Sequence, residues 1–230
     1  MSMNIVVMKF GGTSVANIDK IKKIAKTVAT EAKKNKIIVV LSAMSGETNK
    51  LQSYIDEITN SPSLETDLIL TSGEQVTIGL LSMILNKNGI NSIPLLGWQI
   101  PIVTDNNYEK SRILNINIKN IQHHFKSFQV IVLAGFQGVN SSGFITSLGR
   151  GGSDTTAVAI AASVKADRCD IYTDVEGVFT TDPNIEINAK KIDKLAYEEM
   201  LEMASTGAKV LQTRSVELAM KNDLTLQVLS

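Results

Sequence analysis

The sequence predicts an α/β fold, a three-layer sandwich in which a largely parallel central sheet lies between two layers of helices. Short continuous apolar runs at 5–8 and 37–41 have the length and composition of strands buried on both faces, and the stretch 129–134, apolar after Gln129, is a strong strand prediction. Segments of helical periodicity alternate with them, as at 18–32, where apolar residues recur every three or four positions. Strand and helix in alternation along a whole chain are typical of a parallel sheet covered by helices on both sides.

The remaining elements continue this alternation. Further strands are predicted at 92–96, 169–173 and 225–229, and further helices at 48–59, 66–88 with a break at 72–74, 118–125, 153–164, 196–204 and 214–221. The segment 97–107 has a mixed pattern that indicates only short strands and turns. In parallel sheets, ligands bind at the carboxyl ends of the strands. The residues at those ends include Lys9, Ser42, Gly135, Thr173 and Asp174. We therefore expect one shared edge of the sheet to hold the chemistry.

Composition restricts the class of protein. The 230 residues suffice for one large domain, and an apolar fraction of 43% can fill a substantial core. Lysine plus arginine balance aspartate plus glutamate at 23 each, which argues against recruitment by nucleic acid or an anionic membrane. The single cysteine, Cys169, lies in a strand-like run, where a buried and inert thiol is expected. With no basic leader and no apolar stretch of membrane-span length, we expect a soluble cytoplasmic protein.

A glycine-rich stretch at 146–157 leads into a helix of small apolar residues. It contains three glycines, Arg150 and Asp154. We expect the helix to begin at about Ser153, with Ser153 or Asp154 capping its first backbone amides. Glycines allow close approach of the backbone and a helix N-terminus favours negative charge, so the stretch suits a phosphate or a carboxylate. An ordinary glycine-rich turn before a capped helix accounts for the same residues.

Two cations, Lys9 and Arg150, occur in glycine-rich settings. Together with Asp154 and Asp174 they are the residue types of a phosphoryl-transfer site, where catalysis is mainly positioning and neutralisation of charge. The pattern differs from a Walker P-loop, in which the lysine follows the glycines, because Lys9 precedes the glycine pair at 11–12. The motifs of protein kinases are also missing from the sequence.

A series of short motifs runs along the chain. They are Lys9-Phe-Gly-Gly-Thr-Ser-Val15, Ser42-Ala-Met44, Ser72-Gly-Glu74, Gly135-Phe-Gln-Gly138, Thr146-Ser-Leu-Gly-Arg-Gly-Gly-Ser-Asp154, Tyr172-Thr-Asp-Val175 and Gly207-Ala-Lys209. In this order they resemble the catalytic domain of aspartokinases, within the amino-acid kinase family, from about residue 4 to the C-terminus. The resemblance implies ATP-dependent phosphorylation of the side-chain carboxylate of L-aspartate to 4-phospho-L-aspartate, the first step toward lysine, diaminopimelate, threonine and methionine.

The resemblance also implies roles for individual residues. Lys9 and Asp154 are implied as catalytic. The implied aspartate-binding residues are Ser42, Thr48, Glu74, Arg150 and Ser153, with Arg150 gripping a carboxylate and Glu74 and Asp154 pairing with the substrate ammonium. The implied ATP-binding residues are Lys9, Phe10, Gly11, Gly12, Thr173, Asp174, Phe179, Asp182, Asn184 and Lys209. From the residues alone, Glu74 and Asp154 also suit helix caps, and Lys209 suits a surface position.

Cofactor and partners follow from the same resemblance. Mg²⁺ is expected to be coordinated by the ATP phosphates and to keep several water ligands, so no metal-ligating residue is predicted. We expect a single catalytic domain over 1–230, with an N-terminal substrate-binding part and a C-terminal nucleotide-binding part. A homodimer is expected, and a separate regulatory chain is one option. We expect no ACT regulatory domains in this chain, and hence no feedback inhibition through them.

The chain departs from the aspartokinase pattern beside the nucleotide positions. It has Phe179 where many members have tyrosine, Asn184 where they have arginine, and Gln212-Thr213 where His-Pro is frequent. A cation and a hydroxyl are thus missing there, which puts the affinity for ATP in question. Two alternatives stay open. One is a kinase for another substrate, namely glutamate, N-acetylglutamate or UMP, and the other is a nucleotide-binding partner subunit without catalysis.

Overall fold

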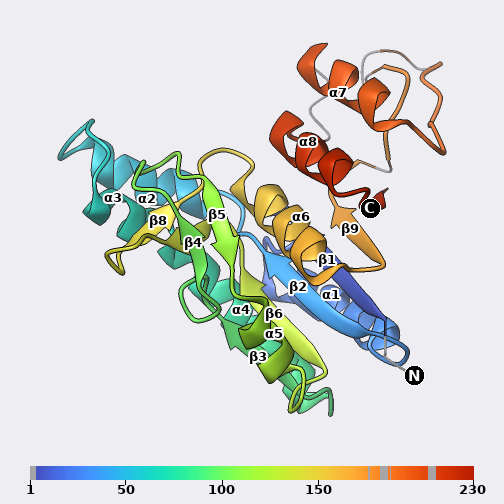
Figure 1. Ribbon diagram of the computed structural model, residues 1–230, viewed down its shortest axis with the longest axis horizontal. Helices are drawn as coiled ribbons and strands as arrows, with labels where there is room; N and C mark the ends of the chain where they lie inside the picture. Colours follow the sequence, from blue (N-terminus) through green and yellow to red (C-terminus); the bar gives the residue numbers. More distant parts are fainter. Residues whose placement is uncertain (1–3, 176, 182–185, 187, 207–210) are drawn as a thin grey trace.

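The centre of the structure is a six-stranded sheet (Figure 1). This computed structural model describes residues 4–175, 177–181, 186, 188–206 and 211–230. The strand order is β10–β9–β1–β2–β6–β3, formed by Ile5–Phe10 (β1), Lys36–Leu41 (β2), Ser92–Leu95 (β3), Val130–Ala134 (β6), Arg168–Tyr172 (β9) and Leu226–Leu229 (β10). All neighbouring strands pair in parallel, which confirms the predicted sheet.

Helices cover both faces of this sheet. The helices of the described residues are Ile18–Glu31 (α1), Glu47–Asp56 (α2), Leu64–Leu70 (α3), Ser72–Lys87 (α4), Ile118–His124 (α5), Gly152–Val164 (α6), Tyr197–Thr206 (α7) and Thr213–Lys221 (α8), of which α3 packs on β8 (Ile145–Ser147). Side chains alternate along a strand, so Val6 and Met8 pack with α1 and α4 in one core, whereas Val7 packs with α6 and α8 in the other. The predicted three-layer sandwich is thereby confirmed.

The register of the parallel strands brings their carboxyl ends to one edge. Phe10, the last residue of β1, lies opposite Leu41 of β2 and Tyr172 of β9. Leu41 in turn lies opposite Ala134, the last residue of β6. The residues that follow these strand ends therefore share one edge, as the sequence predicted.

A second, mixed sheet was not predicted. Its strands, in the order β5–β4–β7–β8, are Ile102–Thr104 (β4), Ile113–Ile116 (β5), Gln137–Val139 (β7) and Ile145–Ser147 (β8). Strands of three or four residues are too short to show the period of two on which sequence assignment depends. This sheet matters for the site because β8 leads directly into the glycine-rich loop at 148–151.

Helix α6 begins differently from the prediction. The residue before its first turn is Gly151, which has a left-handed φ of 70°. Ser153 and Asp154, predicted as caps, lie inside the first turn instead, so that prediction was wrong. Glycine takes the left-handed conformation without a steric penalty, which lets the chain enter the helix without a capping side chain. The prediction that α6 is buried on most sides is confirmed.

One helical stretch, Leu64–Lys87, has the length and composition of a membrane span, contrary to the sequence expectation. It consists of α3 and α4, which are interrupted at Thr71, and half of its most apolar window is buried inside the fold. In α4 the residues Ile78, Leu81 and Leu85 pack against the sheet. The stretch is a core helix pair of the α/β sandwich.

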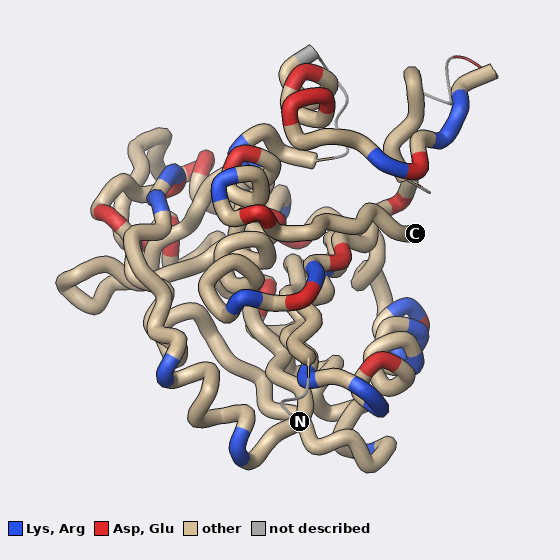
Figure 2. Tube along the Cα trace, turned by 45° about the vertical axis from the view of Figure 1, so that its right-hand side comes forward, with Lys and Arg blue, Asp and Glu red and all other residues tan. Residues whose placement is uncertain are grey.

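Charged residues of both signs are interspersed along the trace (Figure 2). This distribution accords with the formal net charge of zero. Local groups of charge, not a field over the whole molecule, must therefore attract any charged ligand.

The close approach of β6 to α6 gives a test of the packing. A Cβ on Gly135 would lie 2.7 Å from Ser153 Oγ and 3.0 Å from the carbonyl oxygen of Leu41. Gly135→Ala should therefore lower the free energy of unfolding by about 1–3 kcal/mol, measured by urea denaturation. Gly79 lies inside α4 with open space around the Cβ position, so Gly79→Ala should raise it by about 0.5–1 kcal/mol. Equal effects of the two substitutions would contradict this packing.

Candidate active site

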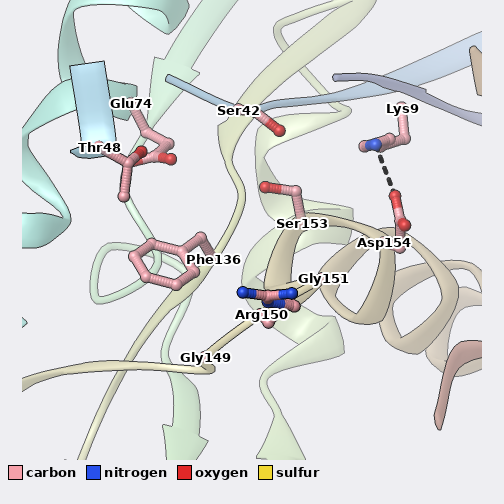
Figure 3. A pocket seen from close by; sticks show the side chains of 11 residues that line it. Lys9, Ser42, Thr48, Glu74, Phe136, Gly149, Arg150, Gly151, Ser153 and Asp154 are labelled. Atoms are coloured by element: carbon pink, nitrogen blue, oxygen red, sulfur yellow. Dashed lines mark ion pairs between the residues drawn. The ribbon is translucent and has the colours of Figure 1, made fainter. Parts of the chain in front are cut away.

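A pocket of about 230 Å³ lies at the carboxyl edge of the sheet (Figure 3). Its lining comes from the ends of β1 and β2, from α2 and α4, from the segment after β6, and from the loop before α6 together with the first turn of that helix. The lining residues are Lys9, Ser42, Thr48, Glu74, Phe136, Gly149, Arg150, Gly151, Gly152, Ser153 and Asp154. The structure thus brings together all the residues that were predicted as catalytic or substrate-binding.

Lys9 and Asp154 form an ion pair across this edge. Lys9 Nζ lies 2.6 Å from Asp154 Oδ1, and the two side chains are only 11% and 12% exposed. Asp154 Oδ1 is buried and has no hydrogen-bond partner among the described residues, so the contact is an ion pair without the geometry of an aligned hydrogen bond. The pair joins β1 to the first turn of α6, where the helix dipole also favours the negative charge of Asp154.

Glu74 is a buried carboxylate in which one oxygen has no hydrogen-bond partner among the described residues. It lies in the first turn of α4 and is 2% exposed. Its Oε1 accepts a hydrogen bond of 3.0 Å from the backbone N–H of Ala43, whereas Oε2 has no partner among the described residues. Burial raises the pKa of Glu74 to about 7, an effect that hydrogen bonds from the Ala43 and Glu74 backbones oppose only in part. An open buried oxygen of this kind is a binding position for a donor.

Gly73 explains how Glu74 comes so near to the loop after β2. A Cβ at Gly73 would lie 2.7 Å from the Cβ of Ala43, so a larger residue would push α4 away. Glycine at this position allows the start of α4 to approach the loop closely. The carboxylate of Glu74 can then reach the amide of Ala43.

Arg150 lies on a loop whose backbone conformation depends on two glycines. Gly149 and Gly151 have φ values of 73° and 70°, which glycine adopts readily and other residues rarely do. The side chain of Arg150 is exposed, and none of the described carboxylates lies within ion-pair distance of it. In Figure 3 it lies beneath Ser153, below the level of Glu74 and Lys9.

Phe136 lines the pocket but was not singled out from the sequence. It has a φ of 68°, an uncommon backbone conformation for a bulky residue. Two contacts hold it, since its N–H donates to Thr156 Oγ1 at 3.1 Å and its carbonyl accepts from the N–H of Leu148 at 2.9 Å. The glycines on either side of the Phe-Gln dipeptide were the only signal in the sequence, and they do not identify a lining residue.

The predicted nucleotide-binding residues are placed only in part. Phe10 ends β1, Gly11 and Gly12 follow it, and the Phe10 ring stacks on Tyr172 with 4.3 Å between ring centroids. Thr173 and Asp174 follow β9, the parallel neighbour of β1, and the Thr173 hydroxyl donates to Asp174 at 3.1 Å. Phe179 forms an isolated bridge with Lys191. Asp182, Asn184 and Lys209 lie outside the described residues.

Two further expectations concern metal and thiol chemistry. Within the described ranges, no group of three or more His, Cys, Asp or Glu side chains is placed to hold a metal ion. Cys169 is fully buried in β9, and burial raises the pKa of its thiol well above the ordinary value. The predicted burial of the thiol is confirmed, and a raised pKa disfavours the reactive thiolate.

Fold and pocket together define a class. This is an α/β protein with a small, charged ligand pocket at the carboxyl edge of a parallel sheet. The chain belongs to the amino acid kinase family, which matches residues 4–230.

Individual relatives confirm the resemblance to aspartokinases. The chain is 52% identical over 229 residues to the aspartate kinase of Pseudomonas putida and 51% identical over 233 residues to the aspartokinase of Rickettsia felis. These matches cover 99% of the chain but 56% and 58% of the two relatives, so the chain spans little more than half of their length.

Solved structures agree with these relatives. Aspartokinase III of Escherichia coli, in complex with aspartate and ADP, superposes with a TM-score of 0.87 at 28% identity, over 97% of this chain and 61% of that one. The aspartate kinase of Synechocystis superposes with a TM-score of 0.84 at 42% identity, over 98% of this chain and 38% of that one.

The raised pKa of Glu74 predicts a pH-dependent effect on stability. Folding raises this pKa from the ordinary 4.5 to about 7. Below pH 4.5 the buried carboxyl is protonated and its contribution to stability is fully present. That contribution is lost as the pH rises through 7, because the folded protein must then bury a charge. Without ligand at pH 8, Glu74→Gln should therefore raise the free energy of unfolding by about 3 kcal/mol. The gain should shrink toward pH 5 in urea denaturation at the two pH values. Glu57→Gln, at an exposed position, should change little, and a Glu74→Gln effect independent of pH would contradict a raised pKa of Glu74.

Proposed function

We propose that the chain catalyses ATP-dependent phosphorylation of the side-chain carboxylate of L-aspartate, giving 4-phospho-L-aspartate and ADP. The observation that carries the proposal is the layout of charge in the pocket. Glu74, whose Oε2 has no partner among the described residues, lies on one side of the pocket and Lys9 on the other, and Arg150 lies below them in the view of Figure 3. This layout complements an amino dicarboxylic acid, and the names of the relatives and the aspartate and ADP bound to the Escherichia coli enzyme support the assignment.

Glu74 and Arg150 would fix the orientation of aspartate. The open Oε2 of Glu74 accepts from the substrate ammonium, with Thr48 beside it in the pocket. The guanidinium of Arg150 grips a carboxylate with two parallel hydrogen bonds. Asp154 was expected to share the ammonium, but it is paired with Lys9. We therefore assign ammonium recognition to Glu74 and the positioning of Lys9 to Asp154.

Lys9 would act on the transferring phosphoryl group. The substrate carboxylate, with an ordinary pKa of about 3.9, is already ionised and attacks without a general base. A carboxylate oxygen forms a bond to the γ-phosphorus while the bond from that phosphorus to the β–γ bridging oxygen breaks, and ADP leaves. The main obstacle is repulsion between two anions, which the Lys9 ammonium and the backbone amides at Gly11 and Gly12 reduce. Ser42 and Ser153 add hydroxyl donors at the same edge.

ATP would bind beside β9, next to Lys9. Thr173 and Asp174 follow the carboxyl end of β9, at the same edge of the sheet as Lys9. We also assign to the nucleotide the other predicted residues, namely Phe10, Phe179, Asp182, Asn184 and Lys209. Because no described cluster of side chains suits a metal ion, Mg²⁺ would be carried by the ATP phosphates, where it neutralises charge.

The cellular setting is part of the same proposal. A kinase of this kind would work in the cytoplasm, at the first step toward lysine, diaminopimelate, threonine and methionine. Within the chain, the N-terminal part would bind aspartate and the C-terminal part the nucleotide. We also propose a homodimer, with a separate regulatory chain as an option.

The proposed activity can be tested by trapping the acyl phosphate with hydroxylamine in the presence of ATP, Mg²⁺ and aspartate. The protein should form aspartyl hydroxamate, and Lys9→Ala should reduce turnover by at least about a hundredfold, because it removes the cation at the transferring group. Lys22→Ala, at an exposed lysine of α1, is the matched control and should be fully active.

Three alternative acceptors belong in the same assay. Faster turnover of glutamate, N-acetylglutamate or UMP than of aspartate would overturn the choice of substrate. ATP binding without turnover in the unsubstituted protein would instead favour a non-catalytic subunit.

A further inference from the structure

Asp67 is a fully buried carboxylate to which the proposed reaction gives no role. It lies in α3 and is 0% exposed. Its Oδ1 accepts from the backbone N–H of Glu109 at 2.9 Å and from the Ser147 hydroxyl at 2.7 Å. Its Oδ2 accepts from the backbone N–H of Ser147 at 2.7 Å. A single side chain thus holds two segments that are far apart in the sequence.

Both segments lead to the loop that carries Arg150. Ser147 ends β8, three residues before Arg150, and its carbonyl also accepts from the N–H of Ser111 at 2.9 Å. Glu109 has a left-handed φ of 61°, and a Cβ on Gly149 would lie 2.7 Å from its carbonyl oxygen. Asp67 therefore fixes the start of the loop directly and supports Gly149 through Glu109.

Asp67 also belongs to the helix pair that carries Glu74. The Thr71 hydroxyl donates to the Asp67 carbonyl at 2.8 Å, and α4 begins at the next residue. The Thr71 carbonyl accepts from Gln137 Nε2 at 3.1 Å. The helices that carry Glu74 and the loop that carries Arg150 are thus connected at Asp67.

We propose that Asp67 is a positioning residue for the amino-acid substrate. By accepting three hydrogen bonds it holds the 147–151 loop against α3, and it thereby sets the separation between Glu74 and Arg150. The identity of the substrate rests on the proposed function, whereas the positioning of the loop does not.

The chemistry of the three partners requires a carboxylate. All three are donors, and the two oxygens of an ionised aspartate only accept. An asparagine would turn an N–H group toward at least one of these donors and leave that donor unsatisfied in the interior. Asp67→Asn keeps the shape of the side chain but removes one contact to the loop, which makes it the informative substitution.

The matched control is Asp170→Asn. Asp170 is also a buried aspartate, 1% exposed, but it lies in β9, where Arg168 Nε donates to it at 3.0–3.1 Å. Its substitution should reduce stability without affecting the Arg150 loop. Ser147→Ala removes one of the three hydrogen bonds and should give a weaker form of the Asp67→Asn effect.

Two measurements test the proposal, steady-state kinetics and amide hydrogen exchange on the whole protein. In Asp67→Asn, KM for aspartate should rise about tenfold or more, while KM for ATP and kcat should stay within about threefold. Exchange of the 147–151 amides should become at least about tenfold faster. Asp170→Asn should show neither effect. This separation of the two KM values distinguishes positioning from general destabilisation.

Several outcomes would overturn the proposal. One is an unchanged KM for aspartate with unchanged exchange in Asp67→Asn, and another is an equal rise in KM for both substrates. If the unsubstituted protein does not phosphorylate aspartate, the proposed function fails and the exchange measurement alone decides, with unchanged loop protection counting against Asp67. If Asp67→Asn does not fold, Ser147→Ala decides by the same two readouts.

Discussion

The contact between Lys9 and Asp154 is the one on which the arrangement of the site depends. It joins a strand of the central sheet to the first turn of α6, and both charges lie where solvent reaches little of them. Removing one partner would leave the other charge uncompensated at a partly buried position, which is strongly unfavourable. Glycine at position 11 leaves room for the pair, because a Cβ there would approach Lys9 Nζ to 3.3 Å. The ion pair therefore links the sheet edge, which the parallel register forms, to the first turn of α6 at the wall of the pocket.

At two positions of the pocket, the residue that suits ligand binding is not the one that would stabilise the fold most. Glu74 keeps one oxygen open in the interior, and Phe136 takes a backbone conformation that bulky residues rarely adopt. A protein selected for stability alone would fill the first position with an apolar residue and the second with glycine. Asp67 shows the opposite case, since both of its oxygens accept hydrogen bonds and the loop it holds is thereby ordered.

Long, regular features were predictable from the sequence. The buried strands are continuous apolar runs, and parallel pairing brings their ends together, so the shared edge with Lys9, Ser42 and Asp174 followed from the pattern alone. The short strands of the second sheet, the left-handed cap at Gly151 and the role of Asp67 did not. Each depends on backbone angles or on hydrogen bonds between distant segments, which leave no local period in the sequence. The partner of Asp154 was not predictable either. Residue types alone do not show whether its carboxylate pairs with Lys9 or is left for the substrate ammonium.

The central claim is that Glu74 presents an open, desolvated carboxylate to the ammonium of the substrate. It is tested most directly by ¹³C NMR of glutamate-labelled protein, in which the Glu74 carboxyl signal, assigned with Glu74→Gln, is titrated with and without aspartate. We expect a pKa of about 7 for Glu74 in the free protein and a clear fall on addition of aspartate, because a bound ammonium favours the ionised form. Succinate, which lacks the ammonium, should produce no such fall. An ordinary pKa in the free protein, or one that aspartate leaves unchanged, would contradict this role of Glu74.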